Sequence, residues 1–405
     1  MITEHPMNAL ERRSVSSLAL LYSFRMLGLF MVLPLLALYA GDFPDASPAQ
    51  IGLALGIYGL TQALLQIPFG WLSDRVGRKP VIVGGLLVFA LGSVVAAMAD
   101  SMDGIVLGRA LQGAGAIAST TMALLADLTR DEQRTKAMAV VGMSIGLSFA
   151  VALVLGPVVA AAWGLSAVFY LTAVLAIAGI VLVIVRVPSP EPTAAVNRHE
   201  DAGAEPGLLA RSFRDIGLAR LNLGVFVLHF ILMASFLVVP RLLESTAGVA
   251  REQHWQVYLI ALVLSVLAML PLMRTAERGG RPQQMFMLGI GLVLVSLVLL
   301  GFMHQAAVVY FALWLFFTGF NYLEATLPSL VSKTVFAGGK GTALGIYSSC
   351  QFLGAFAGGA GGGWILQYGS TSALFFTCIA LALLWLWVAR PMGLVPLDSV
   401  AVPDR

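Results

Sequence analysis

The chain has 405 residues, of which 59% are hydrophobic and 11% are charged, and its formal net charge is +3. Soluble globular proteins carry about 25% charged residues, so the composition excludes that class and indicates a polytopic membrane protein. The small net charge gives no indication of a nucleic-acid partner. Both cysteines, Cys350 and Cys378, lie inside apolar segments, so we expect neither a structural disulfide nor a metal site.

The chain contains a series of apolar segments of about 20 residues, the length that an α-helix needs to cross about 30 Å of hydrocarbon. Residues 1–13 are charged and no small-residue cleavage site follows them, so we expect the first apolar segment to be retained as a helix. We predict twelve transmembrane helices over approximately 15–40, 49–70, 80–99, 104–126, 137–162, 166–185, 221–240, 255–273, 285–303, 306–331, 341–366 and 371–389.

The longest connection between these segments covers residues 187–219 and is rich in proline, glycine and charged residues, which is typical of a flexible linker. Within it, residues 208–218 alternate apolar and charged side chains at intervals that suit an amphipathic helix on the membrane surface. The linker separates an N-terminal six-helix bundle, 1–186, from a C-terminal six-helix bundle with a short tail, 220–405.

The distribution of positive charge predicts the orientation of the chain. If both termini are cytoplasmic, the outside loops hold Arg241 and Arg251, the spans hold Arg25 and Arg109, and all the other Lys and Arg residues lie inside. This asymmetry follows the positive-inside rule and favours cytoplasmic termini.

The most distinctive motif is the turn GWLSDRVGRK, residues 70–79, between the second and third spans. Loop backbone is not stable when exposed to lipid, so this turn must lie at a membrane surface. Asp74 and Arg78 are four residues apart and can pair on a helix end, and Gly77 permits a positive φ. The alternative is an ordinary basic loop that only sets the topology.

The order G-x-L-x-D-R-x-G-R-K resembles the loop between the second and third helices of the major facilitator superfamily of transporters. RALQGAG, residues 109–115, resembles the R-x-x-Q-G-x-G signature of the same family. Residues 155–161 resemble the G-P-x-x-G-G stretch of its antiporters, but Ala160 and Ala161 replace the closing glycines, which weakens the inference of antiport. The resemblance implies an all-α polytopic membrane protein, with twelve transmembrane helices in two six-helix bundles.

Segments of the chain also recur after about 203 to 206 residues. Residues 31–36 recur as 237–242, and the charged turn 70–79 recurs in reduced form at 276–281, where an acidic residue again precedes arginine. A recurrence at this spacing predicts two parallel repeats. Chance similarity between apolar helices is the alternative explanation.

Residues 24–28 and 321–325 resemble the YajR-like bacterial transporters, which are grouped with proton-driven drug efflux carriers. The resemblance implies a secondary active transporter of the bacterial inner (plasma) membrane rather than an enzyme. Proton-coupled antiport, or multidrug efflux, of small amphipathic compounds by alternating access is the expected function. We expect a small-molecule substrate, protons and the lipid bilayer as partners, and a monomer without cofactor, metal or nucleic acid.

Charged side chains inside the spans are costly in a bilayer and mark candidate functional sites. We assign proton coupling to Glu324, Arg109 and Arg25. Glu324 lies well inside a span, where desolvation favours the neutral carboxyl group. The alternative is that Glu324 only hydrogen-bonds Asn321 or Tyr322. Arg109 is expected to face the interior and to bond backbone carbonyls or polar groups of the first span.

The resemblance also implies a charge cluster of Asp74, Arg78 and Asp127 that controls switching between conformations. Asp127 as a purely structural partner of the basic loop, and His229 as a helix-packing residue, are the alternatives. The switch set is Gly70, Asp74, Arg75, Gly77, Arg78 and Asp127. The expected lining of the substrate cavity is Tyr22, Arg25, Phe30, Met31, Gln112, Phe226, His229, Phe230, Met233, Asn321, Tyr322 and Glu324.

Two other functions fit the same sequence. One is a proton symporter or facilitator for a sugar or an organic anion, in which Arg25 would be the anion ligand. The other is a non-transporting membrane sensor. Uptake that collapses with the proton gradient would favour the symporter, and absence of substrate-dependent flux would favour the sensor.

Overall fold

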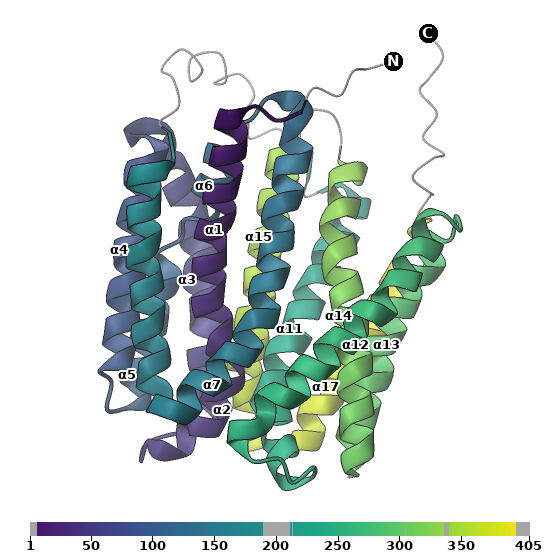
Figure 1. Cartoon of the computed structure of the whole chain (residues 1–405). Coiled ribbons are helices and arrows are strands. Elements are labelled where there is room, and N and C mark those ends of the chain that lie inside the picture. The colour runs from purple at the N-terminus through teal and green to yellow at the C-terminus, as the bar shows by residue number, and fades with distance from the viewer. Residues whose placement is uncertain (1–5, 189–210, 213, 304, 336–339, 394–405) are drawn as a thin grey trace. The chain divides into compact units, whose positions relative to one another are not determined.

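The computed structural model describes residues 6–188, 211–212, 214–303, 305–335 and 340–393, and these are largely helical (Figure 1). Most of the predicted linker therefore lies outside the described residues, as do residues 208–210 and 213 of the amphipathic helix expected over 208–218. Arg211, Ser212 and Arg214 are helical.

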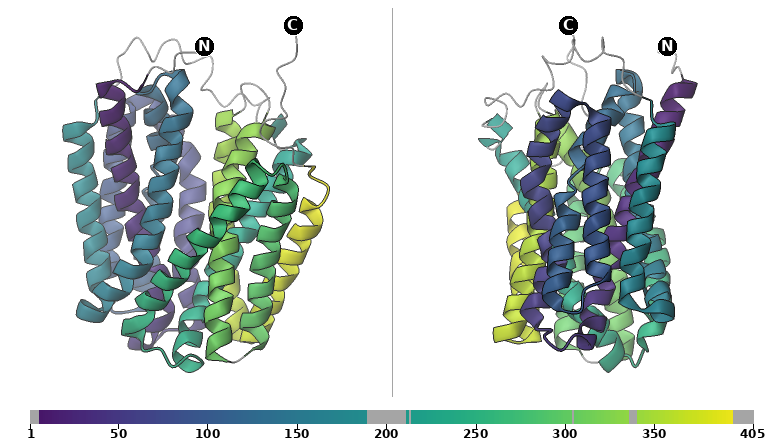
Figure 2. Two further views of the ribbon diagram at one scale, coloured as in Figure 1. Left: turned by 45° about the vertical axis from the view of Figure 1, so that its right-hand side comes forward. Right: turned by 90° about the vertical axis from the view of Figure 1, so that its left-hand side faces the viewer.

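Contacts within the chain define two compact units. Unit 1 comprises residues 1–46 and 54–203, and unit 2 comprises 47–53 and 204–405. The short segment 47–53 thus groups with unit 2, although its sequence position is within the predicted N-terminal bundle. In each unit the helices run side by side (Figure 2).

Unit 1 is built from long helices joined by short turns. The first predicted span is two helices, which meet at Val32, two residues before Pro34. The helices are α1 (Ala9–Met31), α2 (Leu33–Tyr39), η1 (Ala40–Asp42), α3 (Pro48–Val76), α4 (Arg78–Ala97), α5 (Met102–Ala114), α6 (Ala118–Asp127) and α7 (Asp131–Arg186).

Unit 2 has the same kind of construction, and contains a π-helical turn, η3, in the glycine-rich eleventh span. The elements are α11 (Ile216–Ser245), η2 (Arg251–Gln253), α12 (His254–Glu277), α13 (Pro282–Phe302), α14 (Ala306–Thr334), α15 (Lys340–Phe356), η3 (Ala357–Gly361), α16 (Gly362–Tyr368) and α17 (Thr371–Ala389).

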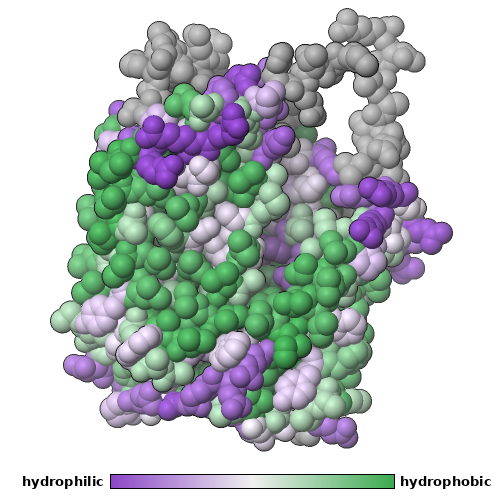
Figure 3. Space-filling model, in the orientation of Figure 1, coloured by the Kyte–Doolittle hydropathy of each residue, from purple (hydrophilic) through white to green (hydrophobic). Residues whose placement is uncertain are grey.

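Nine helices of the described residues are long and apolar enough to cross a membrane. One of them, α7, holds two predicted spans that meet at Gly164, where φ is 80°. The fourth span is divided between α5 and α6, and the eleventh is interrupted by η3, so neither counts as one long helix. The twelve predicted spans are accounted for in this way. Apolar side chains cover the middle of the face in Figure 3, and polar ones gather at the helix ends.

The helix boundaries differ from the predicted ones where polar residues cap the chain. α1 begins at Ala9 rather than near 15, because the Asn8 side chain accepts from the Glu11 backbone N–H and the Glu11 carboxylate accepts from the Asn8 N–H. The charged turn is also shorter than expected. α3 continues to Val76 and α4 starts at Arg78, so Gly77 alone connects them.

The order of helix packing repeats in the two units. In unit 1, α1 packs against α7, and α4 packs against α5 and α7; in unit 2, α11 packs against α15, and α13 against α14 and α17. The turn after the second span has a glycine with positive φ in each repeat, Gly77 at 96° and Gly280 at 65°. This agreement supports the two parallel repeats that the sequence predicts.

Glycines bring the first and fifth helices of each repeat into backbone contact. A Cβ atom on Gly156 of α7 would lie 2.6 Å from the carbonyl oxygen of Met31. In unit 2, a Cβ atom on Gly354 or Gly358 would lie 2.2 Å from the carbonyl oxygen of Phe226 or Phe230, respectively. Small residues permit this close approach of transmembrane helices, which packing forces then stabilise.

We predict that Gly358→Ala destabilises the protein, because the new methyl group overlaps the backbone of α11. Overpacking of this kind costs about 1–3 kcal/mol. Gly361→Ala is the matched control, because a Cβ atom there has no neighbour within 4 Å. Thermal unfolding in detergent should show a lower midpoint for Gly358→Ala and an unchanged or higher one for Gly361→Ala. Equal midpoints for the two variants would contradict the packing described.

Candidate functional site

Among the described residues of unit 1, Arg109 of α5 is the most completely enclosed cation, with 0% of its surface exposed. Its Nε donates to the backbone oxygen of Ala54 in α3 at 3.2 Å, and its Nη1 donates to Oε1 of Gln112 at 2.8 Å. The guanidinium also lies 5.1 Å from the ring centre of Tyr58. The expected interior position and carbonyl partner are present, but the partner belongs to the second span, so the expectation of a bond to the first span was wrong.

The R-x-x-Q-G spacing has a direct structural explanation. Gln112, one turn after Arg109, donates to Ser93 Oγ of α4 at 2.8 Å, and Ser93 donates to the Phe89 carbonyl at 2.8 Å. A Cβ atom on Gly113 would lie 2.3 Å from the Tyr58 carbonyl oxygen. The motif thus joins α3, α4 and α5 through one buried polar chain, with a glycine where the helices meet.

Arg25 of α1 is also buried, with 2% of its surface exposed, but it is less well satisfied. Its Nη2 donates to Oε1 of Gln62, and Gln62 donates to Oε1 of Gln66 at 3.3 Å. Its guanidinium lies 6.0 Å from the ring centre of Tyr58. Among the described residues, Nε and Nη1 of Arg25 have no hydrogen-bond partner. Arg25 is therefore a buried cation with unused donors.

The structure brings Asp74, Arg78 and Asp127 together at the ends of α3, α4 and α6. Arg78 pairs with Asp74, its Nε lies 3.3 Å from Asp127 Oδ2, and its Nη1 donates to Ser73 Oγ at 2.6 Å. The positive φ of Gly77 turns the chain so that Arg78 can reach back to α3.

Two other residues of the predicted switch set have separate positions. Arg75 does not join the cluster; its guanidinium stacks on the exposed Trp71 ring at 3.7 Å. The carbonyl oxygen of Gly70 accepts the Ser73 hydroxyl at 2.6 Å. Arg75 thus lies outside the ion-paired group, whereas Gly70 supports it through Ser73.

In unit 2, Glu324 of α14 meets His229 of α11 and Gln351 of α15. Gln351 Nε2 lies 3.2 Å from Glu324 Oε1 and 2.8 Å from His229 Nε2. His229 Nδ1 lies 3.1 Å from the Val225 carbonyl oxygen, an arrangement that suits a proton on Nδ1 and an acceptor role for Nε2 toward Gln351. Glu324 Oε2, 3.7 Å from His229 Nε2, has no hydrogen-bond partner among the described residues.

The neighbours of Glu324 along α14 face other helices. Asn321 Nδ2 donates to Ser265 Oγ of α12 at 2.9 Å, and the Tyr322 ring is buried against Gly289 of α13. The alternative in which Glu324 hydrogen-bonds Asn321 or Tyr322 is therefore not what the structure contains. Of the predicted cavity residues in unit 2, His229 is the one that lies beside Glu324.

Other predicted cavity residues are held by packing inside their own unit. The Phe30 ring meets Phe149 edge-on at 5.0 Å, and the Tyr22 hydroxyl donates to the Ala118 carbonyl at 2.6 Å. Met31 is buried against Gly156, Met233 is buried in α11, and Phe226 and Phe230 present their backbone to the glycines of α15 and η3. Their role as a substrate wall stays a prediction.

Sequence reasoning missed several polar residues that belong to these clusters. Gln62, Gln66 and Gln351 lie in apolar segments, so the rule that selected Arg25 and Glu324 applies to them as well. The pair of Gln62 and Gln66, one helical turn apart, was a signal in the sequence.

A second omission is the buried carboxylate of Glu11. It accepts from Arg130 Nε at 2.9 Å, from Arg130 Nη2 at 2.9 Å and from the Arg130 backbone N–H at 3.0 Å. Hydrogen bonding to Glu11 raises the pKa of the Arg130 guanidinium. This clamp ties the start of α1 to the start of α7, and no local motif connects residues so distant in sequence.

Twelve spans in two parallel repeats, with charged side chains enclosed between the helices, define a transporter of the polytopic helical class. The sequence profile of the Major Facilitator Superfamily matches residues 18–359, and the chain belongs to that family. It is a secondary transporter and not an enzyme.

Curated relatives agree with this assignment. The inner membrane transport protein YajR of Escherichia coli K12 is 47% identical over 399 residues, which cover 98% of this chain and 87% of that protein. The multidrug resistance protein MdtH of Aeromonas hydrophila is 27% identical over 352 residues, 84% of this chain and 85% of that one. The similarity to YajR places this chain in the inner membrane as a multi-pass protein.

Solved structures show the same fold. The human organic anion transporter MFSD10 (TETRAN) aligns with a TM-score of 0.69 at 21% identity and covers 94% of this chain and 100% of its own. An inward-facing, unoccupied bacterial homologue of the human lysosomal transporter Spinster aligns with a TM-score of 0.73 at 13% identity, over 96% and 98%. At these identities the likeness concerns the fold alone.

We predict that Arg109→Lys destabilises the protein even though it keeps the charge. The lysine ammonium group lacks the planar guanidinium geometry by which Arg109 donates to both Ala54 and Gln112. Each lost hydrogen bond lowers the free energy of unfolding by about 1–3 kcal/mol. Arg75→Lys is the control, because Arg75 is exposed and its change should stay within about 0.5 kcal/mol. Thermal unfolding in detergent measures both. The same midpoint for both variants would show that the Arg109 fork is not needed.

Proposed function

We propose that the protein is a proton-coupled antiporter that exports small amphipathic compounds by alternating access, with both termini in the cytoplasm. The observation that carries the proposal is the cluster of Glu324, His229 and Gln351. It combines a carboxylate and an imidazole, the two groups that exchange protons near neutral pH when their surroundings shift them. The Glu324 side chain is 35% exposed as a whole, whereas its Oε2 atom is buried beside His229.

The geometry supports a simple role for each member. Glu324 carries the proton, because its Oε2 is free of hydrogen bonds from the described residues. Gln351 holds Oε1 and the imidazole in place. In the antiport cycle, protonation of Glu324 from the outside favours substrate release, and deprotonation to the cytoplasm favours substrate capture. Arg109 and Arg25 add positive charge that raises the cost of a proton or a cation resting near them.

The charge cluster on unit 1 is proposed as the switch. Arg78 bridges Asp74 and Asp127, so loss of one carboxylate leaves the guanidinium half paired. A change of this kind shifts a conformational equilibrium by no more than the difference in cluster energy between the states, on the order of 1–3 kcal/mol. The similarity to multidrug resistance protein MdtH supports export as the direction of transport.

We predict that Glu324→Gln abolishes proton-driven accumulation of substrate in proteoliposomes. The amide keeps an oxygen that accepts from Gln351, but it cannot carry a proton. Transport should therefore fall to the level seen with a protonophore, while exchange down a substrate gradient continues. A panel of dyes and antibiotics supplies the substrates.

The matched control is Glu244→Gln, at the exposed end of α11 in the same unit. It should accumulate substrate as the wild type does. Uphill transport of substrate by Glu324→Gln would exclude this residue as the proton carrier.

A second candidate function is transport of an organic anion, as symport or facilitated import, with Arg25 as the ligand. The specific observation that favours it is the pair of unused donors on Arg25. In the described part of unit 1, neither Arg25 nor Arg109 forms an ion pair. A buried cation without a counter-ion is costly, and an anionic substrate would supply one.

This candidate makes its own prediction. Arg25→Gln should weaken the binding of amphipathic carboxylates by about 10- to 100-fold, the equivalent of one charge-assisted hydrogen bond. Binding of amines with the same carbon skeleton should not weaken. Titration of purified protein by intrinsic fluorescence measures both. Equal losses for acids and amines would argue against a specific anion site.

A further inference from the structure

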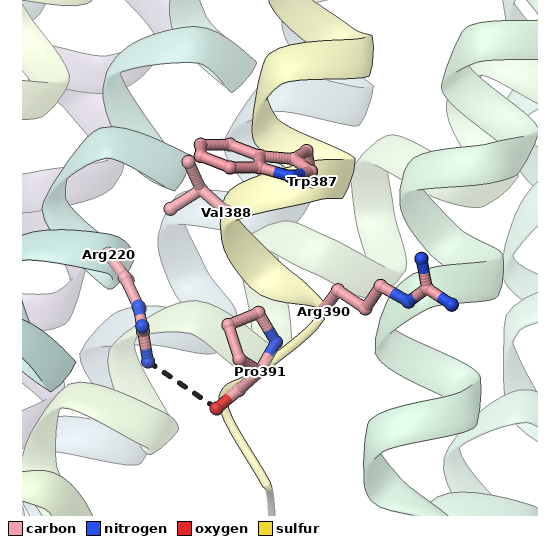
Figure 4. A pocket seen from close by; sticks show the side chains of 5 residues that line it. All are labelled: Arg220, Trp387, Val388, Arg390 and Pro391. Atoms are coloured by element: carbon pink, nitrogen blue, oxygen red, sulfur yellow. Dashed lines mark hydrogen bonds between the residues drawn. The ribbon is translucent and has the colours of Figure 1, made fainter.

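A cavity of about 500 Å³ lies in unit 2 where α11 begins and α17 ends. Its lining consists of Arg220, Trp387, Val388, Arg390 and Pro391 (Figure 4). The α13 helix begins at the same end, because Gln283 Nε2 donates to the Ala389 carbonyl at 2.9 Å. The turn between α12 and α13, with Arg278 and Arg281, therefore belongs to the same side of the membrane.

The cavity has a defined shape because its walls are fixed to neighbouring helices. Trp385 is buried, and its indole nitrogen would lie 2.8 Å from a Cβ atom on Gly224, so α17 rests directly on α11. Arg220 Nη1 donates to the Pro391 carbonyl oxygen at 3.4 Å and holds the chain just after α17. The cavity is thus part of the packed end of the unit.

The charge of the lining is positive. Arg220 and Arg390 contribute two guanidinium groups, which lie on opposite sides of Pro391 (Figure 4). The lining contains no acidic side chain, and neither arginine forms an ion pair with any residue that the structure describes. The Arg220 side chain is half-buried and the Arg390 side chain is exposed, so the lining has the charge to attract an anion.

The remaining wall is apolar and continues along the outer surface of α17. Trp387 is 72% exposed, and Leu384 and Leu383, on the preceding turn, are also exposed. Tryptophan with one polar and one apolar edge favours the level of the lipid headgroups. A ligand that suits both walls is anionic at one end and apolar at the other.

We propose that this cavity binds the phosphodiester headgroup of an anionic phospholipid, with an acyl chain along the exposed face of α17. The site lies at the end of a membrane span, which is the depth of the headgroups. Basic cavities between transmembrane helices bind anionic headgroups through the same combination of charge and apolar contact. The ligand is a molecule of the bilayer, not a soluble phosphate.

The test uses the full chain, purified in neutral detergent, and measures lipid binding by native mass spectrometry. Phosphatidylglycerol and phosphatidylcholine with identical acyl chains are the probes. Each guanidinium near a headgroup is expected to contribute about fivefold in affinity. The wild type should therefore prefer phosphatidylglycerol by about 5- to 25-fold, and the double variant Arg220→Gln/Arg390→Gln should lose that preference.

The double variant Arg278→Gln/Arg281→Gln is the matched control, because it removes two exposed arginines from the same end of unit 2. It should bind phosphatidylglycerol as the wild type does. An equal loss in the control pair would mean that only the overall charge matters, and equal binding of the two lipids by the wild type would overturn the site. Competition by millimolar inorganic phosphate would overturn the assignment to a lipid.

A second readout does not depend on the folding of the double variant. Phosphatidylglycerol with brominated acyl chains should quench tryptophan fluorescence in the wild type, and part of that quenching should be missing in Trp387→Phe. Brominated phosphatidylcholine should quench the wild type less. Arg390→Gln alone, at an exposed position, should reduce the phosphatidylglycerol affinity by about fivefold. Equal quenching in the wild type and in Trp387→Phe would exclude a lipid site beside Trp387.

Discussion

The burial of Arg109 is the constraint on which the arrangement of unit 1 depends. A guanidinium with 0% exposure and no ion pair among the described residues must be satisfied by fixed hydrogen bonds, because an unpaired buried charge costs several kcal/mol. Ala54 accepts from Nε and Gln112 accepts from Nη1, whereas Nη2 has no partner among the described residues; Ser93 extends the chain of bonds to α4. Because α3 and α5 bond Arg109 and α4 bonds Gln112 through Ser93, none of the three helices can shift or rotate alone without breaking a hydrogen bond of this buried chain. The close contact at Gly113 brings α5 near enough to α3 for Arg109 to reach the Ala54 carbonyl.

The two units share a backbone plan but differ in charge. Close glycine contacts recur, with Gly156 on Met31 in one unit and Gly358 on Phe230 in the other. The polar groups do not recur: unit 1 encloses two guanidiniums, whereas the cluster of unit 2 is a carboxylate, an imidazole and an amide. The repeat thus keeps its helix packing while its buried charges differ between the units. Under the proposed function, unit 2 would carry the proton and unit 1 would bind or position the substrate.

Much of the fold could be predicted from the sequence, because length and hydropathy define transmembrane helices and short-range motifs define turns. Gly77 and the pair of Asp74 and Arg78 are local features, and periodicity along one helix was enough to find them. The partners of Arg109 and Glu324 come from other helices, so no spacing along the chain specifies Ala54, Gln351 or His229. The error over the first span has the same origin. Sequence identifies the residue that needs a partner, and only packing decides which helix supplies it.

The connection between α3 and α4 bears on how the protein is made. Gly77 alone joins α3 and α4, so α4 leaves the ribosome directly after α3 without an intervening loop. We expect such a pair to enter the bilayer as one helical hairpin, with the ion-paired turn and its basic residues at one membrane surface. Gly280 gives unit 2 an equivalent tight corner between α12 and α13. An inserted loop at either corner would uncouple the entry of the two helices, and the damage would appear as failed membrane integration before any loss of transport could be measured.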